Sequence, residues 1–145
     1  MGAHRTAMDS AFAILLRRGD VMLVRTKAGR WQLPGGRLKR REKHWDAARR
    51  EVREETGMRA ELLGLTGIYA RRDGSRAVVF AARVVGASRL PGPRNEIREQ
   101  RWVSVRDARR LLSGRTYRRL RDALAAPKAF ARKRSRVSRW RTALG

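Results

Sequence analysis

Three glutamates, Glu51, Glu54 and Glu55, have a spacing that could support metal chemistry. Positions i, i+3 and i+4 lie on one face of a helix, so these carboxylates are expected to be neighbours. Each like-charge pair of this kind costs a helix about 0.2–0.5 kcal/mol, and a chain with 37 basic and 13 acidic residues could easily have avoided that cost. A divalent cation would remove the repulsion, because hard cations prefer carboxylate oxygens. The spacing therefore predicts a metal-binding helix face.

The surrounding residues predict the helix that carries these carboxylates. Across residues 43–56, Trp45, Ala48 and Val52 recur at i, i+3 and i+7 and form an apolar stripe. Gly57 follows, and glycine at this point favours the left-handed conformation that ends a helix. Acidic residues near the C-terminal end also oppose the helix dipole. Two local preferences are broken at one place, which indicates a functional reason for the glutamates.

Residues 36–58 form one continuous pattern around this helix. Its defined positions are Gly36, Glu42, Arg50, Glu51, Glu54, Glu55 and Gly57, with apolar Val52 and Met58, and the letters WQLPG precede it. The pattern resembles the Nudix box with every defined position filled, and the chain is similar to MutT-like Nudix hydrolases. One departure is Arg41, which stands where many relatives have a small residue before the glutamate.

The resemblance implies a metal-dependent site built on these carboxylates. Glu51 and Glu55 are the expected metal ligands, Glu54 is a further ligand or orients the attacking water, and the carbonyl of Gly35 completes the coordination. Arg50 would clamp the neighbouring glutamates, so Glu54, Arg50 and Glu51 are the candidate catalytic residues. The expected cofactor is Mg²⁺, or Mn²⁺ in its place. Such cations neutralise charge on a polyphosphate, orient it and lower the pKa of an attacking water.

Other acidic and glycine residues are expected to complete the site. Gly36 and Gly57 are structural in the motif, and Glu42 would fix the loop against the helix. Relatives often draw another acidic group from a later loop, and Glu99 and Glu96 are the candidates here. Glu99 is therefore included among the expected metal ligands, although a plain surface carboxylate explains each of the two as well.

Candidates for substrate contact lie outside the box. Arg25, at the end of an apolar strand, stands where similar proteins touch substrate phosphate, and a surface position is its alternative explanation. Tyr69 and Phe80 could stack on a base, but a core role explains both more simply. His44 is expected at the surface where the helix starts.

Turn residues and apolar runs predict the other elements. Strands are expected at 10–17, 21–26, 60–70, 76–85 and 97–103, with a short extended piece at 31–33. Helices are expected from Val105, capped by Ser104, and over 116–126, whereas 86–95 is expected to form a loop. The Nudix resemblance implies an α/β fold, namely an α/β/α sandwich with a mixed β-sheet between helices.

Length and composition limit the class of protein. A chain of 145 residues with 41% hydrophobic residues is long enough for one domain with a real core, and the absence of cysteine excludes disulfides and thiolate chemistry. No run reaches the roughly 18 apolar residues of a membrane span, so a cytoplasmic protein without membrane association is expected. We assign residues 1–126 to a Nudix hydrolase domain and 127–145 to a basic C-terminal tail or docked helix. The oligomeric state is not indicated.

The net charge of +24 has two explanations. A basic surface attracts polyanions, either a nucleic acid or a short polyphosphate substrate. The chain also has 32 Arg and only 5 Lys, the usage expected from a GC-rich coding sequence that places arginine at solvated positions. From Pro127 onward there is no acidic residue, so the tail is compatible with a solvated segment, a docked helix, or a contact with nucleic acid or a membrane surface.

The predicted function is metal-dependent hydrolysis of a phosphoanhydride in a nucleoside diphosphate derivative. The favoured substrate is a nucleoside triphosphate, cleaved to a nucleoside monophosphate and pyrophosphate, because the chain has no extra substrate domain. The alternatives are the 5′-triphosphate of RNA, a sugar nucleotide or a dinucleotide. The alternative of another class is a Nudix-fold regulator that binds nucleic acid without catalysis, although such proteins commonly lose box residues that this chain retains.

Overall fold

The computed structural model describes residues 7–89, 96–131 and 144. The strands in this part of the chain are β1 (Ser10–Arg17), β2 (Asp20–Thr26), β3 (Trp31–Gln32), β4 (Gly35–Arg37), β5 (Met58–Ala70), β6 (Arg76–Ala87) and β7 (Ile97–Ser104). The helices are α1 (His44–Thr56), α2 (Val105–Leu111), α3 (Gly114–Leu124) and the short 3₁₀ helix η1 (Pro127–Phe130).

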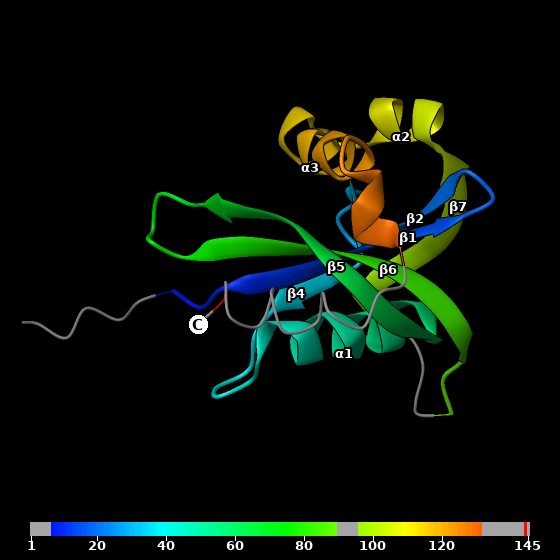
Figure 1. The fold of residues 1–145 in the computed structure, drawn as a ribbon. Helices are drawn as coiled ribbons and strands as arrows, with labels where there is room; N and C mark the ends of the chain where they lie inside the picture. Colours follow the sequence, from blue (N-terminus) through cyan, green and yellow to red (C-terminus); the bar gives the residue numbers. More distant parts are fainter. Residues whose placement is uncertain (1–6, 90–95, 132–143, 145) are drawn as a thin grey trace, which may run out of the picture.

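A mixed β-sheet lies between α1 on one face and α2 and α3 on the other (Figure 1). The strand order is β3-β2-β1-β6-β5, with β4 paired to β1 and β7 paired to β2. Strands β1 and β6 run parallel, whereas β5 and β6, like β2 and β7, pair antiparallel. This arrangement confirms the predicted α/β/α sandwich.

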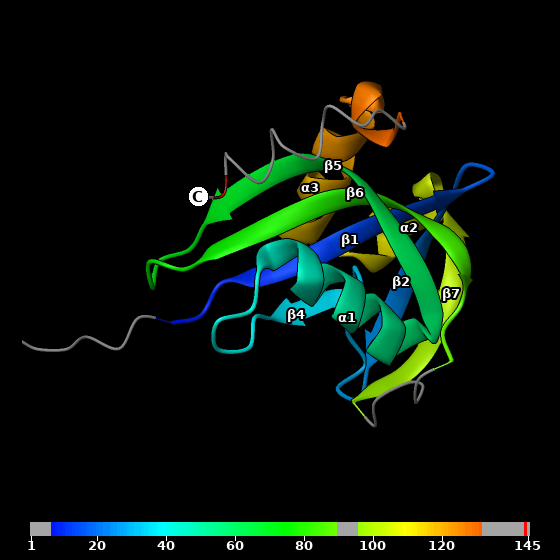
Figure 2. The ribbon, with the colours of Figure 1, turned by 60° about the horizontal axis from the view of Figure 1, so that its bottom comes forward.

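Strand β1 contributes to both layers of the core, because successive side chains of a strand point to opposite faces. Ala13 and Leu15 pack in the apolar cluster that contains Val52 of α1. Phe12 and Ile14 belong to the cluster formed with α2 and α3. Figure 2 shows α1 lying across its side of the sheet, next to β4. The two strands β1 and β4 therefore separate two helical layers.

Local sequence sets the helix ends. Gly57, with a φ of 74°, ends α1, and the side chain of Ser104 caps α2, as predicted. Helix α3 begins at Gly114 and not at Thr116 as expected, because the Ser113 side chain accepts a hydrogen bond from the N–H of Thr116 and so caps an earlier turn.

Four predicted strands and the short extended piece differ from the structure in their bounds. Strand β2 starts at Asp20, β3 ends at Gln32, β5 starts directly after Gly57, β6 continues to Ala87, and β7 extends to Ser104. Gly35 and Gly36, expected only in a tight backbone path, form with Arg37 the short strand β4. The expected loop 86–95 was placed too early, because β6 includes Gly86 and Ala87, and residues 90–95 of it lie outside the described residues.

The predicted tail, residues 127–145, lies largely outside the described residues. In its described part, Ala129 of η1 packs with Leu63 and Ala81 of β5 and β6, and Leu144 is buried in the cluster on the α1 side. The domain boundary at residue 126 stays a prediction. In the described part of the chain, no helix is long and apolar enough to cross a membrane.

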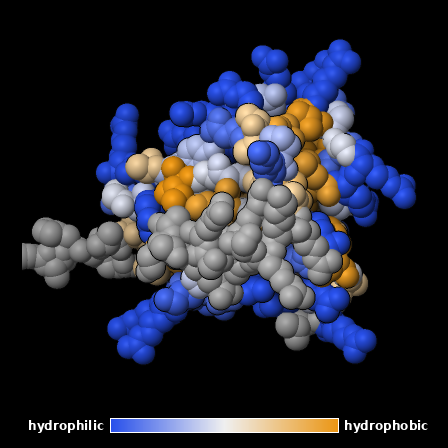
Figure 3. All heavy atoms as spheres, in the orientation of Figure 1, coloured by the Kyte–Doolittle hydropathy of each residue, from blue (hydrophilic) through white to orange (hydrophobic). Residues whose placement is uncertain are grey.

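Hydrophilic side chains project around much of the molecule's outline (Figure 3). Smaller apolar areas lie between them on the face shown in that view. This distribution agrees with a net charge of +24 carried mainly by arginine.

Candidate active site

Helix α1 holds two glutamates against the backbone of β4. Glu51 and Glu55 are 2% and 5% exposed. A Cβ atom on Gly36 would lie 2.5 Å from Oε2 of Glu51, so only glycine permits this approach. The N–H of Gly35 donates to Oε1 of Glu55 at 2.9 Å. The two glycines therefore bring the carboxylates and the strand backbone into direct contact.

Arg50 joins the glutamates into one network. Its Nε and Nη2 donate to the two carboxylate oxygens of Glu42, at 2.7 and 2.8 Å. Its Nη1 donates to Glu51 at 2.5 Å and to Glu54 at 3.2 Å, and Nη2 also donates to the carbonyl of Arg37 at 3.1 Å. One buried guanidinium thus contacts three carboxylates and the end of β4.

The network shifts the pKa values of Glu42 and Arg50. The hydrogen bond from Arg50 holds the pKa of Glu42 below its ordinary value, against the opposing effect of burial. The hydrogen bond to Glu42, followed by that to Glu51, raises the pKa of Arg50. Because one guanidinium charge cannot balance three carboxylate charges, the cluster keeps an excess of negative charge.

The loop from β4 to α1 reaches the network through Glu42. The N–H of Lys39 donates to Oε1 of Glu42 at 2.9 Å, so this carboxylate ties the loop to Arg50. Arg41 adopts a φ of 65°, in the left-handed region that small residues enter more easily. This is the position where the sequence departs from many relatives, and the loop tolerates arginine there.

A divalent cation fits the donor chemistry of this face. Among the described residues, no three His, Asp or Glu side chains form a ready-made metal-binding group, since Glu51 and Glu54 face Arg50 and Glu55 faces Gly35. The donors are nevertheless hard carboxylate oxygens on one rigid helix, two of them nearly buried, with excess negative charge. A cation would compete with Arg50 for Glu51 and Glu54.

Glu99 and Arg25 lie opposite each other on two neighbouring strands. They are paired residues of β7 and β2, with Nη1 of Arg25 lying 3.8 Å from Oε1 of Glu99. Nη2 of Arg101 donates to Glu99 at 2.5 Å. Glu99 would have to leave two arginines to bind a metal, and its proposed role is the weakest of the set. Glu96 is exposed in the turn just before β7.

The aromatic candidates occupy different environments. Phe80 is fully buried in the core on the α1 side, as the simpler explanation predicted. Tyr69 is partly buried against α3, and its hydroxyl donates to Asp122 at 2.8 Å. Burial, with a further contribution from Asp122, raises the pKa of Tyr69 to about 12.

The sequence predicted that His44 lies at the surface, and the structure shows that this prediction is wrong. Its side chain is 13% exposed and its Nε2 lies 2.9 Å from Oδ2 of Asp9. Asp9 also accepts hydrogen bonds from the N–H and Nε of Arg76. Burial raises the pKa of Asp9, but the bonds from His44 and Arg76 together lower it further than burial raises it. The partners are 35 and 67 residues apart, so no local pattern could reveal this contact.

Known proteins share both the sequence pattern and the fold. A family model described as the NUDIX domain matches residues 7–124. The chain is 30% identical over 130 residues to "Putative nudix hydrolase 1" of Caenorhabditis elegans, covering 82% of this chain and 36% of that protein. It is 43% identical over 65 residues to "Putative 8-oxo-dGTP diphosphatase" of Bacillus subtilis, covering 43% of this chain and 44% of that protein.

A solved structure has a similar fold. The Nudix hydrolase from Nitrosomonas europaea has a TM-score of 0.74 at 24% identity, covering 85% of this chain and 91% of that chain. The chain spans less than half the length of the two curated relatives. With the family model covering most of the residues and the complete box lying on α1 and the preceding loop, the chain belongs to the Nudix family.

Proposed function

We propose that this protein hydrolyses a phosphoanhydride bond in a nucleoside diphosphate derivative with the help of a divalent cation, Mg²⁺ or Mn²⁺. The observation that carries the proposal is the buried carboxylate face of α1, where Glu51 and Glu55 lie against Gly36 and Gly35. Without a bound cation, this negative face would repel a polyphosphate. A cation bound there would convert the face into a site that attracts and orients phosphate.

Each residue of the network has a proposed task. Glu51 and Glu55, fixed by β4, would hold the cation, with the carbonyl of Gly35 as a further ligand. Glu54, whose side chain is 19% exposed, would accept a proton from the attacking water or complete the ligand set. Arg50 would orient Glu51 and Glu54. When bound, the cation supplies charge neutralisation and acidifies a water molecule.

The favoured substrate is a nucleoside triphosphate. In this reaction water adds to a phosphorus atom, one anhydride P–O bond breaks, and a nucleoside monophosphate and pyrophosphate are released. The similarity to the Bacillus subtilis relative, whose name describes an 8-oxo-dGTP diphosphatase, supports this choice. Arg25 is a proposed contact for substrate phosphate, because its side chain is partly exposed at the end of β2.

The direct test is a panel of nucleoside triphosphates, sugar nucleotides and dinucleotides assayed with Mg²⁺ or with EDTA. Glu55→Gln removes a proposed metal ligand, and Glu61→Gln on β5, where Glu61 pairs with Arg83, is the matched control. We expect EDTA to abolish hydrolysis and Glu55→Gln to reduce kcat more than about 10-fold, with the control unchanged. Wild-type turnover by Glu55→Gln on every cleaved substrate would overturn the metal-site assignment.

RNA with a 5′-triphosphate is the second candidate substrate, favoured by the basic composition of residues 127–145. Deleting this segment is a poor test, because Ala129 and Leu144 are buried in the domain. Replacing Lys133, Arg134, Arg136 and Arg139 with glutamine removes charge and leaves Ala129 and Leu144 in the chain. If RNA is the substrate, this variant should lose activity on RNA and show a weaker salt dependence, while hydrolysis of free nucleotides is retained.

A further inference from the structure

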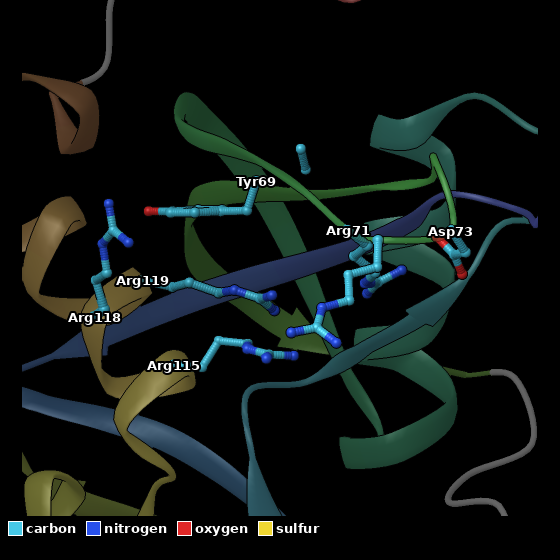
Figure 4. A pocket seen from close by; sticks show the side chains of 8 residues that line it. Tyr69, Arg71, Asp73, Arg115, Arg118 and Arg119 are labelled. Carbon is cyan, nitrogen blue, oxygen red and sulfur yellow. The ribbon is translucent and has the colours of Figure 1, made fainter.

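A cavity of about 410 Å³ lies on the side of the sheet that carries α3. The turn between β5 and β6 contributes Arg71 and Arg72, and α3 contributes Arg115, Arg118 and Arg119. Figure 4 shows Arg71, Arg115 and Arg119 directed toward one another. Five arginines and one acidic residue line the cavity, which we call the arginine cavity. Such a concentration of one charge is unfavourable unless an anion enters it.

Arg119 distinguishes this cavity from an ordinary basic surface. The residue is 8% exposed, and its Nε has no hydrogen-bond partner among the residues that the structure describes. The guanidinium lies 5.2 Å from the ring centre of Tyr69 and 5.6 Å from that of Phe12. Aromatic faces attract the cation but do not replace in-plane acceptors for its N–H groups. Burial, and then the nearby Arg71, lower the pKa of Arg119.

The acidic side chains near the cavity bond to other residues. Asp122 accepts the hydrogen bond from Tyr69 and lies 3.9 Å from Nε of Arg118. Asp73 accepts hydrogen bonds from the N–H and hydroxyl of Ser75 within its own turn. In the described part of the chain, Arg119 therefore has its charge buried without an ion pair.

Codon usage does not explain this arrangement. An excess of arginine from a GC-rich gene should appear at solvated positions, which suits the exposed Arg115 and Arg118. It does not suit Arg119, because a buried guanidinium with an unbonded Nε and no ion pair in the described residues is costly to fold. A bound oxyanion would accept the unused N–H group and balance the charge, since arginine presents donors in a fork that fits phosphate.

The arginine cavity adjoins the same strands as the carboxylate face. Nη1 of Arg71 donates to the hydroxyl of Ser10 at 3.1 Å, and Phe12 lies beneath Arg119. Ser10 and Phe12 of β1 pair with Arg37 and Gly35 of β4. Gly35 in turn bonds to Glu55, so the cavity and the carboxylates flank one short segment of β4. In the described residues β4 pairs with β1 alone.

We propose that the arginine cavity is a subsite for a phosphate group of the substrate that is remote from the hydrolysed anhydride. The inference rests on the proposed function for the reaction at the carboxylates. It narrows the substrate class to nucleotide derivatives that carry an additional phosphate, for example on a ribose. Arg119 is the central donor, with Arg71 and Arg115 beside it.

The first test measures binding of inorganic phosphate and pyrophosphate in EDTA, so that neither the cation nor hydrolysis contributes. Isothermal titration should show saturable binding to the wild type. Arg119→Met should weaken it more than 10-fold, whereas Arg121→Gln, which removes the same charge from the exposed side of α3, should leave it unchanged. The thermal midpoint of free Arg119→Met should be no lower than that of the wild type, because a buried unpaired charge is removed.

Two results would overturn the subsite. One is wild-type affinity in Arg119→Met, and the other is an equal loss in Arg119→Met and Arg121→Gln, which would indicate general electrostatic attraction. If Arg119→Met does not fold, Arg115→Gln repeats the test from an exposed position of the same cavity, with the same two readings. Both results can be obtained whether or not the protein hydrolyses nucleotides, because they depend only on binding.

The second test asks whether the phosphate belongs to the substrate. The pairs NADH and NADPH, and dephospho-coenzyme A and coenzyme A, differ in one ribose phosphate and are assayed with Mg²⁺. The wild type should show a KM at least 10-fold lower for the phosphorylated member of a pair. Arg115→Gln should remove that preference, whereas Arg121→Gln, on the exposed side of α3, should keep it.

The outcomes separate the two proposals. Phosphate binding in EDTA together with equal KM values would mean that the cavity binds a separate anion, which overturns the substrate assignment. Absence of Mg²⁺-dependent hydrolysis of every compound, here and in the nucleotide panel, would overturn the proposed function. Phosphate binding that depends on Arg119 would still stand in that case.

Discussion

Arg50 and Arg119 are equally buried, at 8% exposure each, and lie on opposite sides of β1 and β4. Arg50 donates to Glu42, Glu51 and Glu54, so its charge is enclosed by acceptors. Arg119 packs against two aromatic rings and has an unused N–H group within the described residues. Burial alone therefore does not reveal the role of an arginine. The hydrogen bonds of each arginine do reveal its role. Arg50 organises carboxylates, whereas Arg119 has an N–H group available for an acceptor that does not belong to the protein.

Arg50→Met should give the largest loss of stability, and it tests the contrast between Arg50 and Arg119. Removing Arg50 leaves three partly or fully buried carboxylates without their shared donor, and breaking a buried pair costs about 3–5 kcal/mol. Urea unfolding should show this loss of stability. Arg49→Met is the control, since the exposed Arg49–Asp46 pair is worth no more than about 1 kcal/mol. A stability equal to that of Arg49→Met would contradict the role given to Arg50.

Gly36→Ala tests whether the carboxylates need their close approach to β4. The added Cβ would lie 2.5 Å from Oε2 of Glu51, which must then move. Because small displacements of catalytic groups are expensive, kcat should fall about 10²-fold. Gly114→Ala is the control, because a Cβ there meets no atom within 4 Å. Equal activity in the two variants would show that the position of Glu51 is not critical.

Glu42→Gln tests the charge balance around Arg50 through pH. The lowered pKa of Glu42 means that the folded state favours the carboxylate, so its contribution is complete above the ordinary value of 4.5 and is lost as the pH falls through the lowered value. At pH 7 the variant should be less stable by about 1.5–3 kcal/mol. This difference in stability between wild type and variant should become smaller toward pH 3. A difference that is constant with pH would contradict the pairing of Glu42 with Arg50.

Tyr69 lies beside Arg119, and Tyr69→Phe should give the smallest loss of stability. Loss of the hydrogen bond to Asp122 should cost about 0.5–1.5 kcal/mol. Because the pKa of Tyr69 is raised to about 12, this stabilisation is complete below the ordinary value of 10 and is lost as the pH rises through 12. Ultraviolet titration should show a phenol that ionises near 12 and is missing from the variant. Ionisation of every tyrosine near 10 would argue against the buried environment.

The sequence predicted those features that depend on local patterns. Gly57 ends α1 where glycine was expected to end it, and the apolar stripe with Val52 indicated the buried face of the helix. The box indicated that Glu51, Glu54 and Glu55 act together, and the structure brings Arg50 to two of them. These contacts lie within one helix or its adjoining loop, where spacing determines proximity.

Features that depend on distant partners were not predictable. Asp9, His44 and Arg76 meet only after β1, α1 and β6 have packed. Arg119 is one of 32 arginines, and its burial depends on the packing of α3 against Tyr69 of β5 and Phe12 of β1. The predicted metal role of Glu99 came from family resemblance, and the sequence does not reveal that Arg25 and Arg101 surround this carboxylate.

The most direct measurement for the central claim is Mn²⁺ binding without substrate, followed by electron paramagnetic resonance. Wild-type protein is compared with Glu51→Gln, Glu55→Gln and the control Glu61→Gln, each checked for an unchanged thermal midpoint in EDTA. We predict that the wild type and the control bind Mn²⁺ alike, whereas loss of Glu51 or Glu55 weakens binding about 10–100-fold. Equal Mn²⁺ affinity in all four proteins would contradict a metal site on this face of α1.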